Sequence, residues 1–199
     1  MTASSQVLVT GNEVYRVAGW GISIYGGAEA RDNVAHDNTN GIAVNNATAA
    51  GNRVYHNTGT GIHAVNNAQV TGNAIYGNAV GIYATVNYWW SERFTGTIAN
   101  NLIYANTNRA IRIGEASGPQ VVNNTIYQSV GDAIRVEGGS QNTRVRNNIL
   151  WVEAGYGLSV SGDSQVGLSS DFNLFFQGPD PNSHVGFWGG ADRHLLADW

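Results

Sequence analysis

Asparagine recurs along the chain at steps of 19 to 28 residues, and each copy opens the same short pattern. An apolar residue follows two positions later and a ring three positions later, as in Asn52, Val54 and Tyr55. An internal repeat of this length favours a stacked, repetitive architecture over one irregular core. The eight recurring asparagines are Asn12, Asn33, Asn52, Asn73, Asn101, Asn124, Asn148 and Asn173.

Each repeat also carries two apolar residues separated by one position. This spacing is typical of a β-strand with one buried face. The pairs are Ile22 and Ile24, Ile42 and Val44, Ile62 and Ala64, Ile82 and Ala84, Ile111 and Ile113, Ile134 and Val136, and Leu158 and Val160. No repeat can bury such a face alone, so neighbouring repeats must stack. Eight coils at about 4.8 Å per strand would make a column roughly 34 Å tall.

The turns of the repeat carry two expectations. An inward asparagine is expected to bond the backbone of its own coil and the asparagine of the next coil, because asparagine suits turn dihedrals. The glycine before each isoleucine, such as Gly61, is expected to adopt a positive φ.

The pattern Asn-x-(Ile/Val)-Tyr-x-Asn-x-x-Gly-x-Gly-Ile covers Asn12 to roughly Phe176, and the stretch 171–176 reads Asp-Phe-Asn-Leu-Phe-Phe. On these motifs the sequence resembles the right-handed parallel β-helix superfamily, the pectate-lyase-like fold with carbohydrate-binding and sugar-hydrolase repeats. We therefore expect an all-β, single-stranded right-handed parallel β-helix of about eight coils over residues 1–177. Residues 178–199 are expected to form an irregular segment on or beyond the last coil.

Composition limits the function. The net charge of −4 argues against general nucleic-acid binding. All ten basic residues are arginine, which excludes lysine-based catalysis, and the lack of cysteine excludes thiolate chemistry. No apolar run approaches membrane length, so no membrane insertion is expected.

The resemblance implies an extracellular or cell-surface protein, of bacterial type, although no signal peptide is visible. The chain is interpreted as a fragment of a longer protein. Its open coil ends are exposed strand edges, which flanking domains or end-to-end association could cover.

In a stacked repeat, function is expected on the outward positions of one strand column. The outward column between the paired apolar residues contains His63, Tyr83, Arg112 and Arg135. Arg112 and Arg135 should lie side by side, which costs free energy unless the charges are balanced. Two explanations stay open: an anionic ligand such as a uronate polysaccharide, or a surface network with Asp132, Glu115 and Glu137.

The 28-residue step contains an aromatic insertion over residues 87–94. We expect it to emerge beside the arginines, where Tyr88, Trp89 and Trp90 would stack on sugar rings and Arg93 would assist. Packing over a neighbouring coil, or contact with a missing domain, is the alternative.

For function, the resemblance points to lyases, epimerases and hydrolases of acidic polysaccharides. Lyase or epimerase chemistry needs a group that neutralises the carboxylate and a base for the C5 proton. Candidate catalytic residues are Arg112, Arg135, Tyr83, His63 and Asp132; candidate substrate-binding residues are Arg109, Tyr88, Trp89, Trp90, Arg93 and Glu137.

A hydrolase would need two carboxylates, for which Asp132 and Glu137 are the one nearby pair. No cofactor is predicted. The family resemblance alone implies calcium, because no acidic cluster occupies adjacent outward positions in this sequence. The competing hypothesis is a non-catalytic polysaccharide-binding or spacer module of a surface protein.

Overall fold

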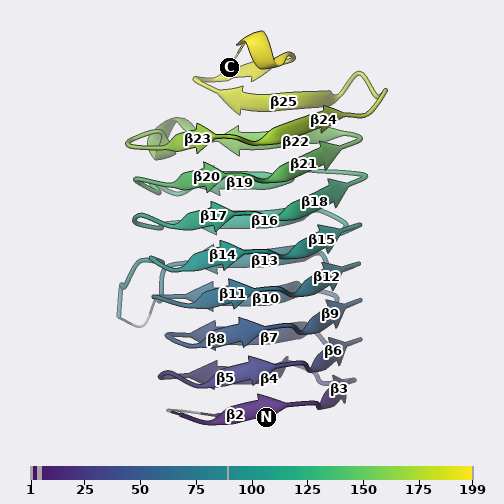
Figure 1. Cartoon of the computed structure of the whole chain (residues 1–199), viewed down its shortest axis with the longest axis vertical. Helices are drawn as coiled ribbons and strands as arrows, with labels where there is room; N and C mark the ends of the chain where they lie inside the picture. The colour runs from purple at the N-terminus through teal and green to yellow at the C-terminus, as the bar shows by residue number, and fades with distance from the viewer. Residues whose placement is uncertain (1, 4–5, 89, 199) are drawn as a thin grey trace.

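The chain forms a column of stacked coils, shown in Figure 1 with the N-terminus at the bottom and the C-terminus at the top. The computed structural model describes residues 2–3, 6–88 and 90–198. Three parallel sheets run the length of the column, and each coil contributes one strand to each sheet. Two of the sheets have eight strands, which confirms the prediction of about eight coils.

Sheet A carries the longest strands, mostly of six residues, and sheets B and C carry shorter ones. Sheet A consists of β1 (Thr2–Ala3), β4 (Trp20–Tyr25), β7 (Asn40–Asn45), β10 (Thr60–Val65), β13 (Val80–Thr85), β16 (Arg109–Gly114), β19 (Ile134–Glu137), β22 (Gly155–Val160), β25 (Ser183–Trp188) and β26 (Ala191–Arg193). Sheet B consists of β2 (Leu8–Thr10), β5 (Glu29–Arg31), β8 (Thr48–Ala50), β11 (Gln69–Thr71), β14 (Thr97–Ala99), β17 (Gln120–Val122), β20 (Arg144–Arg146) and β23 (Ser169–Asp171). Sheet C consists of β3 (Glu13–Tyr15), β6 (Val34–His36), β9 (Arg53–Tyr55), β12 (Ala74–Tyr76), β15 (Leu102–Tyr104), β18 (Thr125–Gln128), β21 (Ile149–Val152) and β24 (Leu174–Gln177).

The interior of the column is filled by the apolar residues that the repeat pattern marks. Ile62, Ile82 and Ile111 pair in register along sheet A and are fully buried. The residue between each apolar pair points outward, as His63 does between Ile62 and Ala64. One strand face is therefore committed to the core and the other is left for function.

The recurring asparagines form a buried ladder, as predicted. The side-chain Oδ1 of Asn101 accepts both the backbone N–H and the side-chain Nδ2–H of Asn73, at 3.0 Å each. Asn101 in turn donates from Nδ2 to the carbonyl of Val70 in the coil below, at 3.0 Å. A second ladder runs parallel to it through Asn38, Asn57, Asn78 and Asn106, and ends where Gln128 accepts from the backbone of Asn106.

The expectation that the glycine before each isoleucine adopts a positive φ is wrong. Gly41 lies within β7 and has no positive φ; a Cβ there would instead collide with the carbonyl oxygen of Gly61 in the next coil. A positive φ occurs instead at the residue before each ladder asparagine, for example at Gly51 (63°) and Asn100 (58°). The repeated glycine is needed for close approach between coils, and the turn strain is carried elsewhere.

Two features interrupt the regular stack. The insertion after β13 stands out from the outline of the column in Figure 1. The second is the segment 178–199, which was predicted to be irregular but contains two strands. β25 pairs in parallel with β22, and β26 folds back and pairs antiparallel with β25. Sheet A therefore continues by backbone pairing beyond the point where the sequence repeat ends.

The remaining elements are two 3₁₀ turns, η1 (Gly162–Ser164) and η2 (Leu196–Asp198). Within the described residues there is no helix that is long and apolar enough to cross a bilayer.

Candidate functional site

The outward face of sheet A carries a column of rings and guanidinium groups. The strand register places His63 beside Tyr83, Tyr83 beside Arg112, and Arg112 beside Arg135, as the sequence predicts. The four residues come from β10, β13, β16 and β19, so about one strand spacing separates each from the next. Residues that are 20 to 30 positions apart in sequence thus form one continuous strip.

His63 is held between two aromatic rings. Its imidazole stacks on Trp20, with ring centroids 5.4 Å apart, and lies 5.6 Å from the ring of Tyr83. Burial lowers the pKa of His63 below its ordinary value of 6.5, because the charged form is poorly solvated there. A neutral imidazole is the form that can accept a proton.

Tyr83 lies between this imidazole and a cation. The guanidinium carbon of Arg112 lies 4.6 Å from the centroid of the Tyr83 ring. Cation–π contact of this kind fixes the guanidinium over the ring. The strip therefore brings together a neutral base, a phenol and a positive charge within three neighbouring strands.

The charges of Arg112 and Arg135 are balanced by carboxylates of the chain itself. Glu137 accepts from Nε of Arg112 at 2.5 Å through one oxygen and from Nε of Arg135 at 2.6 Å through the other. Asp132 accepts from Arg135 at 3.2 Å. Of the two explanations left open by the sequence, the internal network is present, although without Glu115.

These contacts perturb both carboxylates. Burial raises the pKa of Asp132, against the opposing hydrogen bonds from Arg135 and the backbone of Tyr156. Burial also acts on Glu137, but the hydrogen bonds from Arg135 and Arg112 outweigh it and hold the pKa of Glu137 below its ordinary value. Arg109, at the start of β16, adds a weaker favourable charge to Asp132.

The insertion is tied to the coils above it. The hydroxyl of Tyr88 donates a hydrogen bond to Glu115 at 2.9 Å. Glu115, which was expected to join the arginine network, therefore binds the insertion instead. Arg93 donates to the carbonyls of Gly139 (2.8 Å) and Ala116 (3.4 Å), and Phe94 is fully buried. The insertion is thus anchored near its start, by Tyr88, and at its end, by Arg93 and Phe94.

Two rings of the insertion, Tyr88 and Trp90, also border the coils below. Trp90 is 68% exposed and Tyr88 is 67% exposed. Both line a groove of about 450 Å³ on sheet A, which lies over β4, β7 and β10 rather than over the arginines. Trp89 lies outside the described residues.

Small outward residues create this groove. Ser23 and Ala43 occupy the outward column at the positions before His63, and His63 closes one end. Tyr25 and Asn45 form the side next to the insertion. Tyr25 and Asn45 were not predicted as site residues from the sequence. The small residues Ser23 and Ala43, which precede His63 in the outward column, could have indicated the groove.

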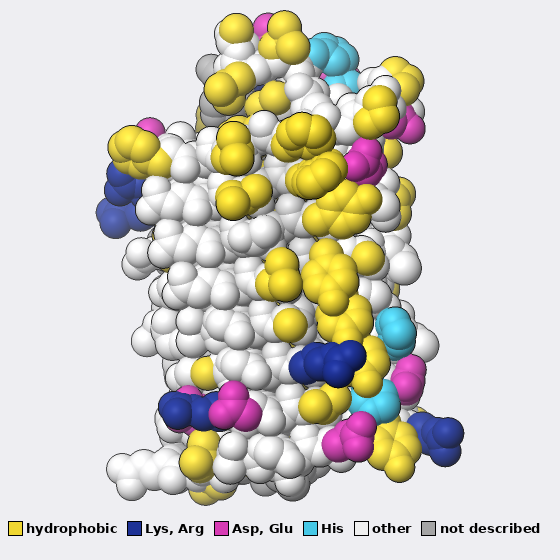
Figure 2. Space-filling view, turned by 45° about the vertical axis from the view of Figure 1, so that its right-hand side comes forward, with side chains coloured by type: hydrophobic (Ala, Val, Ile, Leu, Met, Phe, Trp, Pro, Cys, Tyr) yellow, Lys and Arg dark blue, Asp and Glu magenta, His cyan; other side chains and the backbone are white. Residues whose placement is uncertain are grey.

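A second aromatic column runs along sheet C, where Figure 2 shows a band of hydrophobic side chains along the long axis. The rings of Tyr55 and Tyr76 stack at 5.0 Å and 3°, and those of Tyr76 and Tyr104 at 4.7 Å and 9°. Because each face covers its neighbour, these rings present edges to solvent. They are poorly placed to stack on a sugar, in contrast to the exposed rings of the groove.

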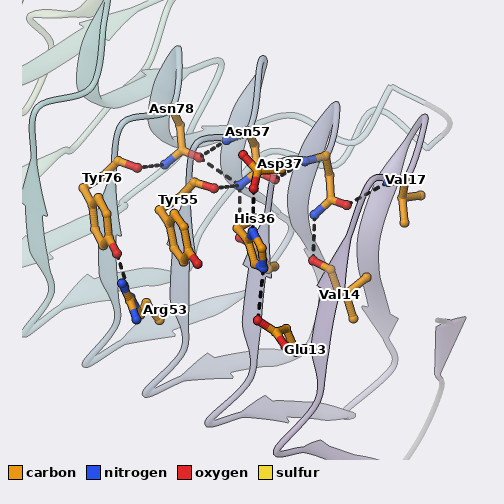
Figure 3. A network of polar contacts seen from close by, with 12 residues as sticks. Glu13, Val14, Val17, His36, Asp37, Arg53, Tyr55, Asn57, Tyr76 and Asn78 are labelled. Atoms are coloured by element: carbon orange, nitrogen blue, oxygen red, sulfur yellow. Dashed lines mark hydrogen bonds and ion pairs between the residues drawn. The ribbon is translucent and has the colours of Figure 1, made fainter.

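Polar contacts fix this second column, as Figure 3 shows. Arg53 donates from Nε to the hydroxyl of Tyr76 at 2.6 Å, and the imidazole of His36 lies 3.2 Å from Glu13 and 2.7 Å from Asp37. The second aromatic column is therefore structural, whereas the groove with exposed rings lies on sheet A.

No group of three or more histidine or acidic side chains that could hold a metal ion lies among the described residues.

Comparison with known proteins agrees with this architecture. Residues 45–175 match the family described as "right handed beta helix region". A search by sequence returned no curated relative.

Two solved structures share the fold. An alginate lyase from Paenibacillus sp. str. FPU-7 superposes with a TM-score of 0.62 at 14% identity, over 95% of this chain and 90% of the lyase. The A-module of a mannuronan C-5 epimerase from Azotobacter vinelandii superposes with a TM-score of 0.54 at 19% identity, over 87% of this chain and 57% of the module. At these identities the likeness concerns the fold alone.

Proposed function

Because the chain belongs to the right-handed β-helix family, we propose that it acts on an acidic polysaccharide bound along the outward face of sheet A. The reaction is proton transfer at a uronate residue, with His63 or Tyr83 as the proton-transfer groups. The observation that carries this proposal is Tyr83, placed between a neutral imidazole and the guanidinium of Arg112. The imidazole, His63, closes one end of the open aromatic groove.

The chemistry needs those three groups together. A base removes the proton at C5, and the cation withdraws charge from the adjacent carboxylate as the C5 carbanion develops. The electron pair then forms the C4–C5 double bond while the bond from C4 to the glycosidic oxygen breaks. The leaving oxygen takes a proton from the acid. His63 and Tyr83 project from neighbouring strands of one sheet, so both would approach the sugar from the same side.

That common side favours elimination over epimerisation, because inversion at C5 requires the proton to return to the opposite face of the ring. Arg109 and Arg135 would support Arg112 in holding the carboxylate, and Tyr88, Trp90 and Arg93 would border the glycan. The names of the two structural neighbours, an alginate lyase and a mannuronan epimerase, are consistent with this class of substrate. The proposal includes an extracellular or cell-surface location.

A purified-protein assay tests the proposal directly. The protein is incubated with alginate, polygalacturonate and unsulfated chondroitin, while ultraviolet absorbance reports unsaturated product and deuterium uptake reports exchange at C5. We expect absorbance to grow on at least one polymer, and Tyr83→Phe to lower the rate by about 10²-fold or more. Tyr55→Phe, in the stacked column of sheet C, is the matched control and should keep full activity.

The internal neutralisation of both arginines favours a second candidate, a polysaccharide-binding module without catalysis. A thermal shift with a glycan, without absorbance growth or C5 exchange, would select this candidate. No interaction with any uronate polymer would contradict both.

A further inference from the structure

We infer that two histidines, His184 and His194, form a pH-sensitive clasp that holds the C-terminal hairpin closed at neutral pH and releases its outer strand in acid. The hairpin consists of β25 and β26, and the outer strand, β26, is followed by the turn η2. This inference goes beyond the proposed function and requires no glycan.

The outer strand of the hairpin is held by few contacts. β26 pairs with β25 through three residue pairs, and its other edge has no partner strand among the described residues. In addition, the hydroxyl of Tyr156 on β22 donates to Asp192 at 2.7 Å, and Arg193 donates to the carbonyl of Trp188 at 3.3 Å. A strand held by so few contacts opens more readily when one of them is lost.

The histidine pair supplies one of these contacts. The two Nδ1 atoms lie 2.9 Å apart, which is a hydrogen-bond distance between one Nδ1–H donor and one unprotonated Nδ1 acceptor. His184, on β25, is 9% exposed and stacks on the ring of Tyr156, with ring centroids 5.2 Å apart. His194, which directly follows β26, is exposed. The buried imidazole is therefore fixed, and the exposed one is the partner that can move away with the outer strand.

The number of protons on the pair decides whether this contact can form. When both imidazoles are neutral, or when one is protonated, one Nδ1 can carry a hydrogen that the other accepts. When both are protonated, both Nδ1 atoms are donors and two positive charges face each other, so the hydrogen bond is lost. The charge of histidine ordinarily changes between pH 5 and 8, so the clasp should open toward the acid end of this range.

Other ionisable groups face the pair from the neighbouring elements. They are Tyr156 from β22, Asp192 and Arg193 from β26, and Asp198 from η2, which accepts from the backbone of the residue after His194. Burial and the hydrogen bond to Asp192 raise the pKa of Tyr156 to about 12, so the phenol stays protonated throughout this range. Histidine is the side chain type that ordinarily changes charge there, so the pair is the sensor in this set.

Release of the outer strand would uncover the end of the column. A hollow of about 430 Å³ lies at this end, lined by Leu168, Ser170, Trp188, Arg193 and Asp198. Arg193 and Asp198 belong to the segment that the clasp holds, whereas Leu168 and Trp188 pack against the core. Opening in acid therefore exposes apolar surface at the C-terminal end.

Hydrogen exchange measured by NMR at about pH 7.5 and about pH 5 tests the clasp. Protection factors are compared for the amides of residues 191–198 and for those of β11, which report opening of the middle of the stack. We expect protection of residues 191–198 to fall about fivefold or more in acid relative to β11, as for the loss of one hydrogen bond.

Variants separate the pair from a general effect of acid. In His194→Gln the side-chain amide can bond to His184 in either protonation state, because its oxygen accepts and its nitrogen donates, so the acid-induced loss should disappear. His194→Ala removes the contact and should lower protection at both pH values. His56→Gln, which replaces an exposed histidine after β9, is the matched control and should keep the wild-type response.

Two results would overturn the inference. One is equal relative protection of residues 191–198 at both pH values in the wild-type protein, and the other is an undiminished effect of acid in His194→Gln. Because neither measurement involves a glycan, failure of the polysaccharide assay overturns the proposed function and leaves the clasp standing. Failure of the exchange experiment overturns the clasp and leaves the proposed function standing.

Discussion

At the residue scale, the repeat assigns different tasks to positions that look alike in the sequence. The outward column includes Ala43 and His63 at equivalent positions of adjacent strands, yet one leaves a hollow and the other closes its end. His63 gains its character from its neighbours, since Trp20 and Tyr83 remove water from the imidazole. The same burial that prepares it as a base makes folding sensitive to acid.

The pH dependence of His63 has a definite sign. Its pKa is lower in the folded than in the unfolded state, so its contribution is complete above about pH 6.5 and is lost as the pH falls toward the folded-state pKa. His63→Gln should therefore flatten the fall in Tm below about pH 6.5, as measured by circular dichroism across the acid range. The exposed His56→Gln serves as control; an equal flattening there would contradict the assignment.

The ladder asparagines should differ sharply between the interior and the end of the stack. Asn101→Ala strands two donors of Asn73 and the carbonyl of Val70 in the core, so we expect a loss of about 2–5 kcal/mol in the free energy of unfolding. Asn12→Ala, at the open end, removes side-chain donors only and should cost about 1 kcal/mol or less. Urea unfolding measures both; similar costs would contradict the cooperative ladder.

At the element scale, the pairing of β16 with β19 decides the electrostatics of the candidate site. The two strands place Arg112 against Arg135, and Glu137, at the end of β19, bridges them through its two oxygens. The cation that would face a uronate is thus held in position by a carboxylate of the chain. A glycan carboxylate must compete with Glu137 or bind a free edge of the guanidinium groups.

Glu137→Gln tests this bridge in two ways. The variant should lose about 1–3 kcal/mol of stability at neutral pH, because two charge-assisted hydrogen bonds are replaced by weaker ones. Since the pKa of Glu137 is lowered by folding, its stabilisation is present above about pH 4.5 and is lost as the pH falls below it, where the two proteins should converge. The unbalanced arginines should also bind uronate oligosaccharides more tightly.

Thermal unfolding and calorimetric titration measure these effects, with Glu92→Gln on the insertion as the control. If Glu137→Gln left both stability and uronate affinity unchanged, the bridge would carry neither role.

At the scale of the whole molecule, the stack has protected middle coils and exposed ends. β11 is paired on both sides, by β8 and β14, whereas β2 and β3 at one end and β23 and β24 at the other are paired on one side only. In a structure built from nearest-neighbour contacts, local opening should begin where one neighbour is missing.

Hydrogen exchange should show this gradient. Amides of β2, β3, β23 and β24 should exchange faster than those of β11, β12, β14 and β15, because opening an end breaks one interface and opening the middle breaks two. Exchange measured by mass spectrometry on peptides from each coil checks this expectation. Uniform protection along the column would instead indicate that all coils open together.

Much of this architecture was predictable from the sequence because it depends on local spacing repeated many times. The spacing of the asparagines predicted the number of coils, and the paired apolar residues predicted the core. The same spacing predicted the strand register, including Arg112 beside Arg135. Where the repeat stops, prediction stopped too, and the strand β25 was missed.

The tertiary structure alone decided what depends on distances between residues many positions apart. Glu137 balances both arginines, Gly41 is set by a carbonyl of the next coil, and the insertion faces the lower coils with Trp90 while Tyr88 binds Glu115. A repeat determines which residues share a column, since its spacing sets the register. It does not determine where a side chain or a loop turns once it leaves the column, because that direction follows from contacts that no spacing records.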